Sequence, residues 1–196
     1  MKKVFYLLVA SLMLNSCGTF YLGYDMAFEK GQVEDKTYLV VEKTFENDDI
    51  RVTLDFTKQQ FFVTIENKTN ERISLIWDKS SLIFPDGVID RLIPDGTRFI
   101  NTDLTVLPTV IPPKAKAVKS FCTTKQINYE VYKYYGASGW VVKNLFPYKP
   151  KKKANLLNHY NYLLDDYLKI YLPLEYENGR KESVTLYLKI DNLKAI

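Results

Sequence analysis

Apolar and polar residues alternate along much of the chain, with the period of two that is typical of half-buried β-strands. Residues 50–56 and 60–67 each place apolar side chains at every second position, and the short TKQ segment between these runs suits a hairpin. Shorter runs of the same kind, most of them next to Pro, Asn, Asp or Gly turn signals, are 71–77, 80–87, 88–96, 115–123 and 128–135. This part of the chain is therefore predicted to consist of short antiparallel strands.

The clearest hairpin lies near the end of the chain. Residues 168–174 and 184–190 alternate with the same period, and Asn178-Gly179 between them favours a type I′ turn. Pro173 has no N–H group, so we expect the first of these two strands to lie at a sheet edge or to carry a bulge. Strand order and sheet assignment stay open at this stage.

One segment departs from the strand pattern. Between about residues 154 and 166 the apolar residues recur at helical spacing, which predicts a short amphipathic helix across one end of the strands. The GASGW segment (136–140) is interpreted as a turn. Many short strands with turns between them indicate an all-β protein, an antiparallel sandwich with this helical insertion, over residues 37–196. No such period is visible from Phe20 to about Lys36, which is interpreted as a polar tether or an irregular first segment.

The first sixteen residues have the three parts of an export signal. Lys2 and Lys3 precede an apolar run of about eleven residues, which is too short to span a bilayer, and small or polar residues follow it. A buried N-terminal helix is the alternative, but it would not need uniform apolarity between lysines and a small-residue exit. Leu14, Asn15, Ser16 and Cys17, followed by Gly18, resemble the lipobox of bacterial lipoproteins, in particular those of Bacteroidetes.

This resemblance implies that residues 1–16 are removed and that Cys17 becomes the first residue, with a diacylglyceryl group on its sulfur. The membrane is then a partner through that lipid, because two or more acyl chains give stable anchoring. Residues 17–36 become the lipidated N-terminus and tether. The expected location is the cell envelope, at the outer membrane of a Gram-negative bacterium, with the periplasmic or surface side left open.

Loss of the signal removes two lysines and lowers the net charge from +4 to +2. So balanced a charge argues against nucleic-acid binding, which rests on concentrated positive charge. Cys122, the other cysteine, lies in a predicted strand and is interpreted as a buried, inert thiol.

The middle of the chain resembles the immunoglobulin-like sandwich domains of bacterial envelope lipoproteins. In these, a strand that ends in Asn-x-Thr turns into a strand with an aromatic residue, and a Pro-Pro segment precedes a later strand. The residues that carry the likeness are Asn67, Thr69, Trp77, Asp78, Pro112 and Pro113. The resemblance implies the fold and brings no catalytic residue with it.

Catalytic patterns are sparse in the sequence. His159 is the only histidine, so a site with several histidine ligands is excluded, and no metal or cofactor is expected. Ser138 lies between glycines but lacks the Gly-x-Ser-x-Gly spacing of a nucleophile elbow. A hydrolase that uses Ser138 and His159 is therefore only a third option, and we expect no enzyme activity.

Tyrosines and tryptophans are the remaining feature, because six of them lie between positions 129 and 148. Tyr132, Tyr134 and Trp140 are candidate ligand-binding side chains, since Tyr and Trp give rigid, amphipathic contact surfaces. Alternatively, these rings pack beneath the helix. The sequence thus predicts a lipid-anchored, non-enzymatic binding or structural module with an unknown envelope protein as partner. A carbohydrate-binding module is the alternative.

Overall fold

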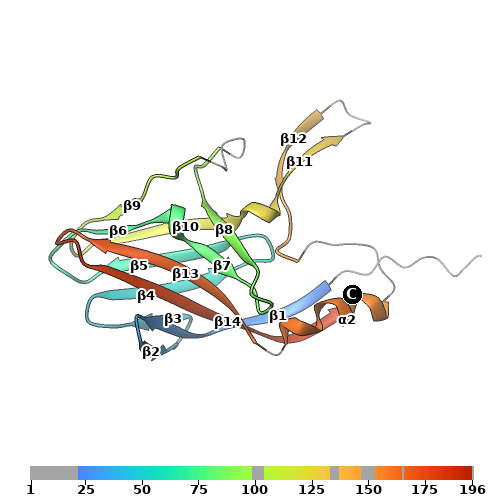
Figure 1. The fold of residues 1–196 in the computed structure, drawn as a ribbon, viewed down its shortest axis with the longest axis horizontal. Coiled ribbons are helices and arrows are strands. Elements are labelled where there is room, and N and C mark those ends of the chain that lie inside the picture. The colour runs from blue at the N-terminus through green and yellow to red at the C-terminus, as the bar shows by residue number, and fades with distance from the viewer. Residues whose placement is uncertain (1–21, 99–103, 133–136, 147–152, 165, 196) are drawn as a thin grey trace, which may run out of the picture.

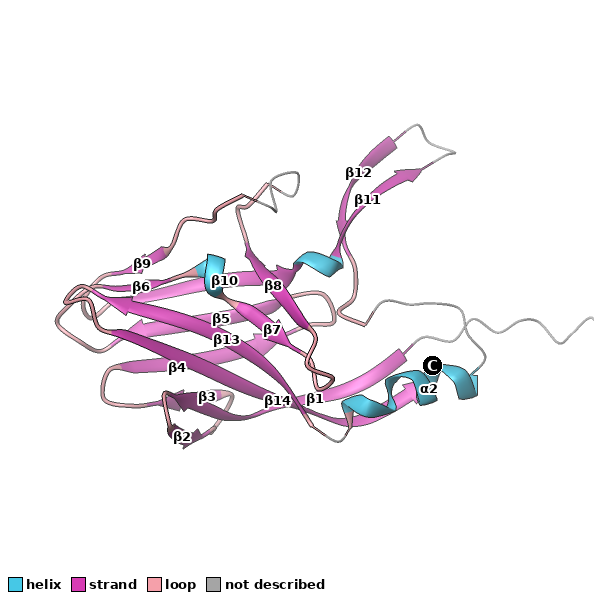
Figure 2. Ribbon diagram, in the orientation of Figure 1, coloured by secondary structure: helices cyan, strands magenta, loops and turns pink. Residues whose placement is uncertain are grey.

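The computed structural model describes residues 22–98, 104–132, 137–146, 153–164 and 166–195. Its strands are β1 (Leu22–Val33), β2 (Lys36–Leu39), β3 (Thr44–Glu46), β4 (Ile50–Phe56), β5 (Phe61–Asn67), β6 (Ile73–Leu75), β7 (Ser81–Ile83), β8 (Ile89–Pro94), β9 (Thr109–Ile111), β10 (Lys116–Thr123), β11 (Ile127–Tyr132), β12 (Ala137–Val142), β13 (Tyr167–Tyr176) and β14 (Lys181–Ala195). The helices are α2 (Lys153–Tyr160) and the 3₁₀ turns η1 (Trp77–Lys79), η3 (Thr124–Gln126) and η4 (Asn161–Leu163). Figures 1 and 2 show these elements.

The strands form an antiparallel sandwich. One layer contains β2, β1, β14 and β13, which is extended by β7, β6 and β9, and the other contains β8, β10, β5, β4 and β3. Pairing between β7 and β8 joins the layers into one continuous ladder. The predicted all-β class, an immunoglobulin-like antiparallel sandwich with a short helical insertion, is confirmed at this level of architecture. The helix covers residues 153–160 and continues as η4, close to the predicted range.

The core lies between the two layers and is filled by the alternating apolar residues. Leu172 and Leu186 are examples, each fully buried and each followed two positions later by another buried residue. Burial of an aliphatic side chain contributes about 1.5–3 kcal/mol relative to exposure. One apolar face for each strand is therefore what fixes the register of the β4–β5 and β13–β14 hairpins.

The prediction of a tether up to residue 36 does not hold for residues 22–33. They form β1, which pairs with β14 along its length and with β2 on the other side. The pairing of β1 with β14 shifts between Asp25 and Met26 and again between Phe28 and Lys30. These two irregularities break the period of two, which is why the pattern along this segment did not indicate a strand.

Pro173 lies neither at an edge nor in a bulge. It pairs with Ser183 of β14 on one side. On its other side, β13 pairs with β7 through residues 169–171 and with β6 through 174–176, so Pro173 falls between the two. The turn η1 interrupts the neighbouring chain at this point, and the Pro173 carbonyl accepts a hydrogen bond from the Ile76 N–H, 3.0 Å away. The ladder on this side of β13 is therefore interrupted at Pro173, where the proline has no N–H to donate.

Asn67 joins the end of β5 to the segment after β9. Its buried amide Nδ2 donates to the carbonyl oxygens of Glu71, Ile111 and Pro112 at 2.7, 3.1 and 3.0 Å. Its Oδ1 accepts from the backbone N–H and the hydroxyl of Thr69. The Asn-x-Thr and Pro-Pro signals of the sequence therefore meet in one hydrogen-bond network that has a structural role.

Gly31 allows the far edges of the two layers to pack closely. A Cβ added to Gly31 in β1 would lie 2.2 Å from Cδ1 of the Phe45 ring in β3. Phe45 also contacts Phe28 and stacks on Tyr38, with ring centroids 6.3 and 5.8 Å apart. Side-chain packing therefore covers this edge of the core, where β1 and β3 share no ladder.

Candidate functional site

Strands β11 and β12 form a two-stranded sheet of their own, which projects from the sandwich (Figure 1). The register pairs Tyr129 with Trp140 and Val131 with Ser138, so these four side chains share one face. Tyr129, Val131 and Trp140 are 54, 68 and 43 % exposed. An isolated pair of strands is marginally stable in water, and this one presents apolar surface to solvent. We call this surface the hairpin face.

The Tyr129 and Trp140 rings contact each other edge to face, with centroids 5.3 Å apart and planes at 69°. The Tyr129 hydroxyl donates a hydrogen bond to Ser138 Oγ at 2.6 Å. Of the three predicted ligand-binding aromatics, Trp140 is therefore exposed beside Tyr129. Tyr134 and the side chain of Tyr132 lie outside the described residues. The 136–140 segment, interpreted as a turn, contributes residues 137–140 to β12 instead.

Gln126 fixes the base of this hairpin to the sandwich. Its buried Nε2 donates to the carbonyl oxygens of Gln59 and Lys143 at 2.9 and 3.0 Å, and its Oε1 accepts from the Thr123 N–H. The Gln126 carbonyl in turn accepts a hydrogen bond from the Lys143 N–H. Both strands of the hairpin are thus held at their base while the hairpin face stays accessible.

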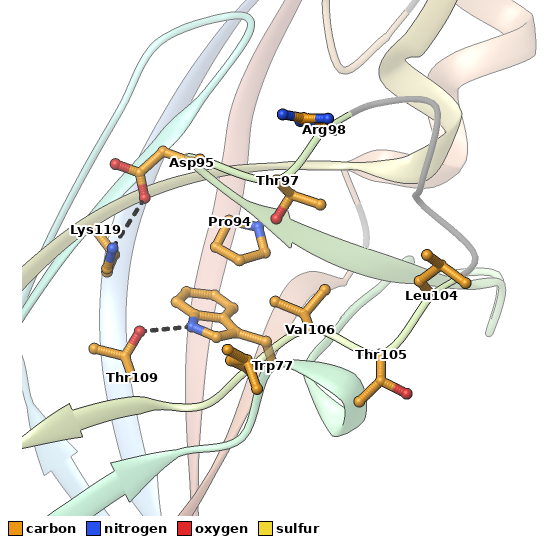
Figure 3. A pocket seen from close by; sticks show the side chains of 12 residues that line it. Trp77, Pro94, Asp95, Thr97, Arg98, Leu104, Thr105, Val106, Thr109 and Lys119 are labelled. Carbon is orange, nitrogen blue, oxygen red and sulfur yellow. Dashed lines mark hydrogen bonds and ion pairs between the residues drawn. The ribbon is translucent and has the colours of Figure 1, made fainter.

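A second candidate is a cavity of about 360 Å³ beside β8 (Figure 3). The indole of Trp77 forms part of its wall, and the indole Nε1–H donates to Thr109 Oγ1 at 2.8 Å. Asp95 and Lys119 form an ion pair of 3.5 Å at the rim. The volume lies in the range of small-molecule pockets. Three of its polar groups, on Trp77, Asp95 and Lys119, already bond to one another or to Thr109.

The structure does not bring Ser138 and His159 together. Ser138 lies on β12, where its hydroxyl accepts a hydrogen bond from Tyr129 of β11. His159 lies on α2, where its ring packs against Tyr160 with centroids 4.8 Å apart. A nucleophile and its base need a separation of about 3 Å. This pair therefore provides no activated serine.

The structure describes only one of the two cysteines. Cys17 lies outside the described residues. Cys122 is buried on β10, as interpreted from the sequence, and burial together with the nearby Asp90 charge raises the pKa of its thiol to about 11. At neutral pH the thiol is protonated, and a protonated thiol is a poor nucleophile.

Neither a metal-ligand cluster nor a membrane-spanning helix is present in the described part of the chain. There, no group of three or more His, Cys, Asp or Glu side chains is arranged to hold a metal ion. Within the same residues, every helix is too short or too polar to cross a bilayer.

Two features of these sites were missed by the sequence reasoning. Pairing of Tyr129 with Trp140 depends on the hairpin register, and the glycines around Ser138 masked β12 as a turn. The cavity beside Trp77 is lined by the end of β8, residues 95–98 and 104–107, Thr109 of β9 and Lys119 of β10, a combination that no local pattern indicates. No protein-family model, curated protein or solved structure matches this chain.

Proposed function

We propose that this protein is a lipid-anchored, non-enzymatic module of the bacterial cell envelope that binds an envelope protein through the hairpin face. The anchor is the diacylglyceryl group on Cys17, which the Leu14–Gly18 lipobox resemblance supports. Binding is supported by one observation above all: the hairpin carries Tyr129, Val131 and Trp140 exposed on one side, away from the core.

The contact chemistry of this face suits a protein partner. Trp and Tyr are enriched among the residues that dominate binding energy, because they bury a large area at a low cost in side-chain entropy. Lys143, directly after β12, pairs with Glu130 of β11 at 3.0 Å, and both side chains lie on the face of the hairpin opposite the hairpin face. The hairpin face itself is thus free of that charge pair, and the core of a protein interface is likewise depleted of charged residues.

A photo-crosslinking experiment in intact envelopes tests the binding proposal. A benzophenone amino acid replaces Val131 on the hairpin face or, as a matched control, Val118 of β10, which is 63 % exposed on the sandwich itself. We expect a discrete crosslinked protein from position 131 only, and we expect Trp140→Ala to remove most of it. Equal products at both positions, or none at 131, would contradict the proposal.

The exposure of Trp140 also favours a second candidate, a carbohydrate-binding module. An indole ring can stack on the apolar face of a sugar, but the 69° angle to Tyr129 prevents the two rings from forming one flat platform. Affinity electrophoresis in gels with envelope polysaccharide distinguishes the candidates. Retardation that Trp140→Ala abolishes supports glycan binding, whereas equal mobility of both proteins in every gel argues against it.

Absence of catalysis is tested separately. A soluble chain that begins at Gly18 is expected to leave ester, peptide and glycoside substrates unchanged. Turnover that is lost in Ser138→Ala or His159→Ala would refute the non-enzymatic part of the proposal.

A further inference from the structure

The start of β1 and the end of β14 lie together at one end of the molecule. Leu22 pairs with Ala195 there, and α2 lies against β14 at the same end (Figure 1). The turn between β13 and β14 lies at the opposite end, so that the fifteen residues of β14 separate the two ends by about 45 Å. We call the end that contains Leu22, Ala195 and α2 the α2 end.

The sequence limits how far Cys17 can be from the α2 end. Only five residue steps separate Cys17 from Leu22, and even a fully extended chain of that length spans at most about 18 Å. A lipid on Cys17 therefore holds the α2 end close to the bilayer. If the long axis stands upright on the bilayer, the opposite end lies about 45 Å from its surface.

Aromatic rings fill the α2 end. The Phe146 ring lies edge to face with Tyr24 of β1, Phe84 and Tyr160 of α2, with centroids 5.0, 6.3 and 5.8 Å apart. Beside this cluster is a cleft of about 250 Å³, whose apolar lining includes Leu145. The hydroxyl of Tyr24 is buried, and burial raises the pKa of this group to about 12.

Residues at the mouth of this cleft match the chemistry of a lipid–water interface. Tyr162 and Val88 line it and are 36 and 41 % exposed. Lys125 is exposed at the same cleft, with its Nζ 5.9 Å from the centroid of the Phe84 ring. Tyrosine prefers the headgroup region, and lysine can extend its ammonium group to phosphates while its stem stays on apolar surface.

Charge at this mouth is nearly balanced. Asp86 is exposed at the cleft and offsets Lys125. The carboxylate of Asp90 is buried and already accepts hydrogen bonds from the Thr124 hydroxyl and the Lys125 N–H. Contact with a bilayer would therefore depend on apolar and aromatic insertion more than on anionic lipid.

We propose that the α2 end rests on the bilayer in which the Cys17 lipid is inserted, with Tyr162 and Val88 in the headgroup layer. This orientation rests on the proposed lipid anchor. It places the β13–β14 turn away from the membrane and lets the hairpin face engage a partner beside the bilayer.

Fluorescence quenching by lipid tests the orientation. Lipidated protein that begins at Cys17 and carries Trp140→Phe is placed in vesicles of phosphatidylethanolamine and phosphatidylglycerol that contain a doxyl-labelled phosphatidylcholine. Tyr162→Trp or, as a second variant, Val88→Trp reports on the α2 end, and Lys181→Trp reports on the far end, where residue 181 is exposed. The buried Trp77 contributes equally to all.

We expect the added tryptophan at position 162 or 88 to lose about half of its emission, and that at 181 to lose little, because interfacial side chains lie within the headgroup layer. Equal quenching at both ends, or stronger quenching at 181, in vesicles that carry the protein on flotation would overturn the orientation. Protein that neither carries a fatty-acid label nor floats would refute the anchor itself, and with it the orientation.

Discussion

Gly31 shows how a single missing methyl group can shape an edge of this sandwich. The ring of Phe45 occupies the space that a Cβ at residue 31 would take, so the ring lies directly on the β1 backbone. The sequence pattern identified Phe45 neither as core nor as a partner of Gly31, because the two residues lie on strands that share no ladder. Only the tertiary arrangement brings them together.

Gly31→Ala is therefore expected to destabilise the protein by about 1–3 kcal/mol, because the new Cβ would lie 2.2 Å from the ring and something must shift. Urea unfolding measures the change. Gly139→Ala on β12 is the matched control, since a Cβ there has open space, and we expect it to be close to neutral. Equal stability of Gly31→Ala and the parent protein would show that Phe45 does not need this close approach.

Strands that bury only one face could be predicted from the sequence pattern, whereas β1 and β12 could not. Strands β4 and β5 occupy the residues that the period of two indicates, because each buries one face only. Strand β1 has bulges, and β12 contains Gly139 next to Ser138, so neither shows a clean alternation. Local pattern thus reports burial on one face, while pairing depends on contacts distant in sequence.

The hairpin of β11 and β12 is expected to be dispensable for folding. Its two strands pair only with each other. The Gln126 hydrogen bonds that hold the base of the hairpin are made by residues outside both strands. Replacing residues 128–141 with a short Asn-Gly turn should leave the cooperative thermal transition within a few degrees of the parent, because about 1 kcal/mol shifts Tm by roughly 2–4 °C at this size. The same deletion should abolish crosslinking. A loss of cooperative unfolding would instead make the hairpin part of the core structure.

For the molecule as a whole, buried weak acids predict sensitivity to alkali. Burial raises the pKa of Cys122 to about 11 and of Tyr24 to about 12, and burial together with the hydrogen bond to Glu182 raises that of Tyr176. In the unfolded chain these groups lose their protons nearer to pH 9–10. The unfolded state then binds fewer protons, so the free energy of unfolding falls as pH rises above about 9.

We therefore expect the urea midpoint to be lower at about pH 10.5 than at pH 8, with a smaller decrease in Tyr24→Phe, which has no hydroxyl to ionise. Absorbance of tyrosinate during a pH titration measures the ionisation directly. A midpoint that stays constant or rises over this interval would contradict the role assigned to these buried groups.

The lipid anchor proposed at Cys17 would determine where the whole molecule acts, and the proposals for the hairpin face and the α2 end both depend on it. Metabolic labelling with an alkyne fatty acid in a Gram-negative host tests it most directly. The parent protein and Cys122→Ser are expected to carry the label, because the lipid thioether forms at Cys17, and Cys17→Ala is expected to carry none. Label on Cys17→Ala, or an unlabelled parent protein, would contradict the account.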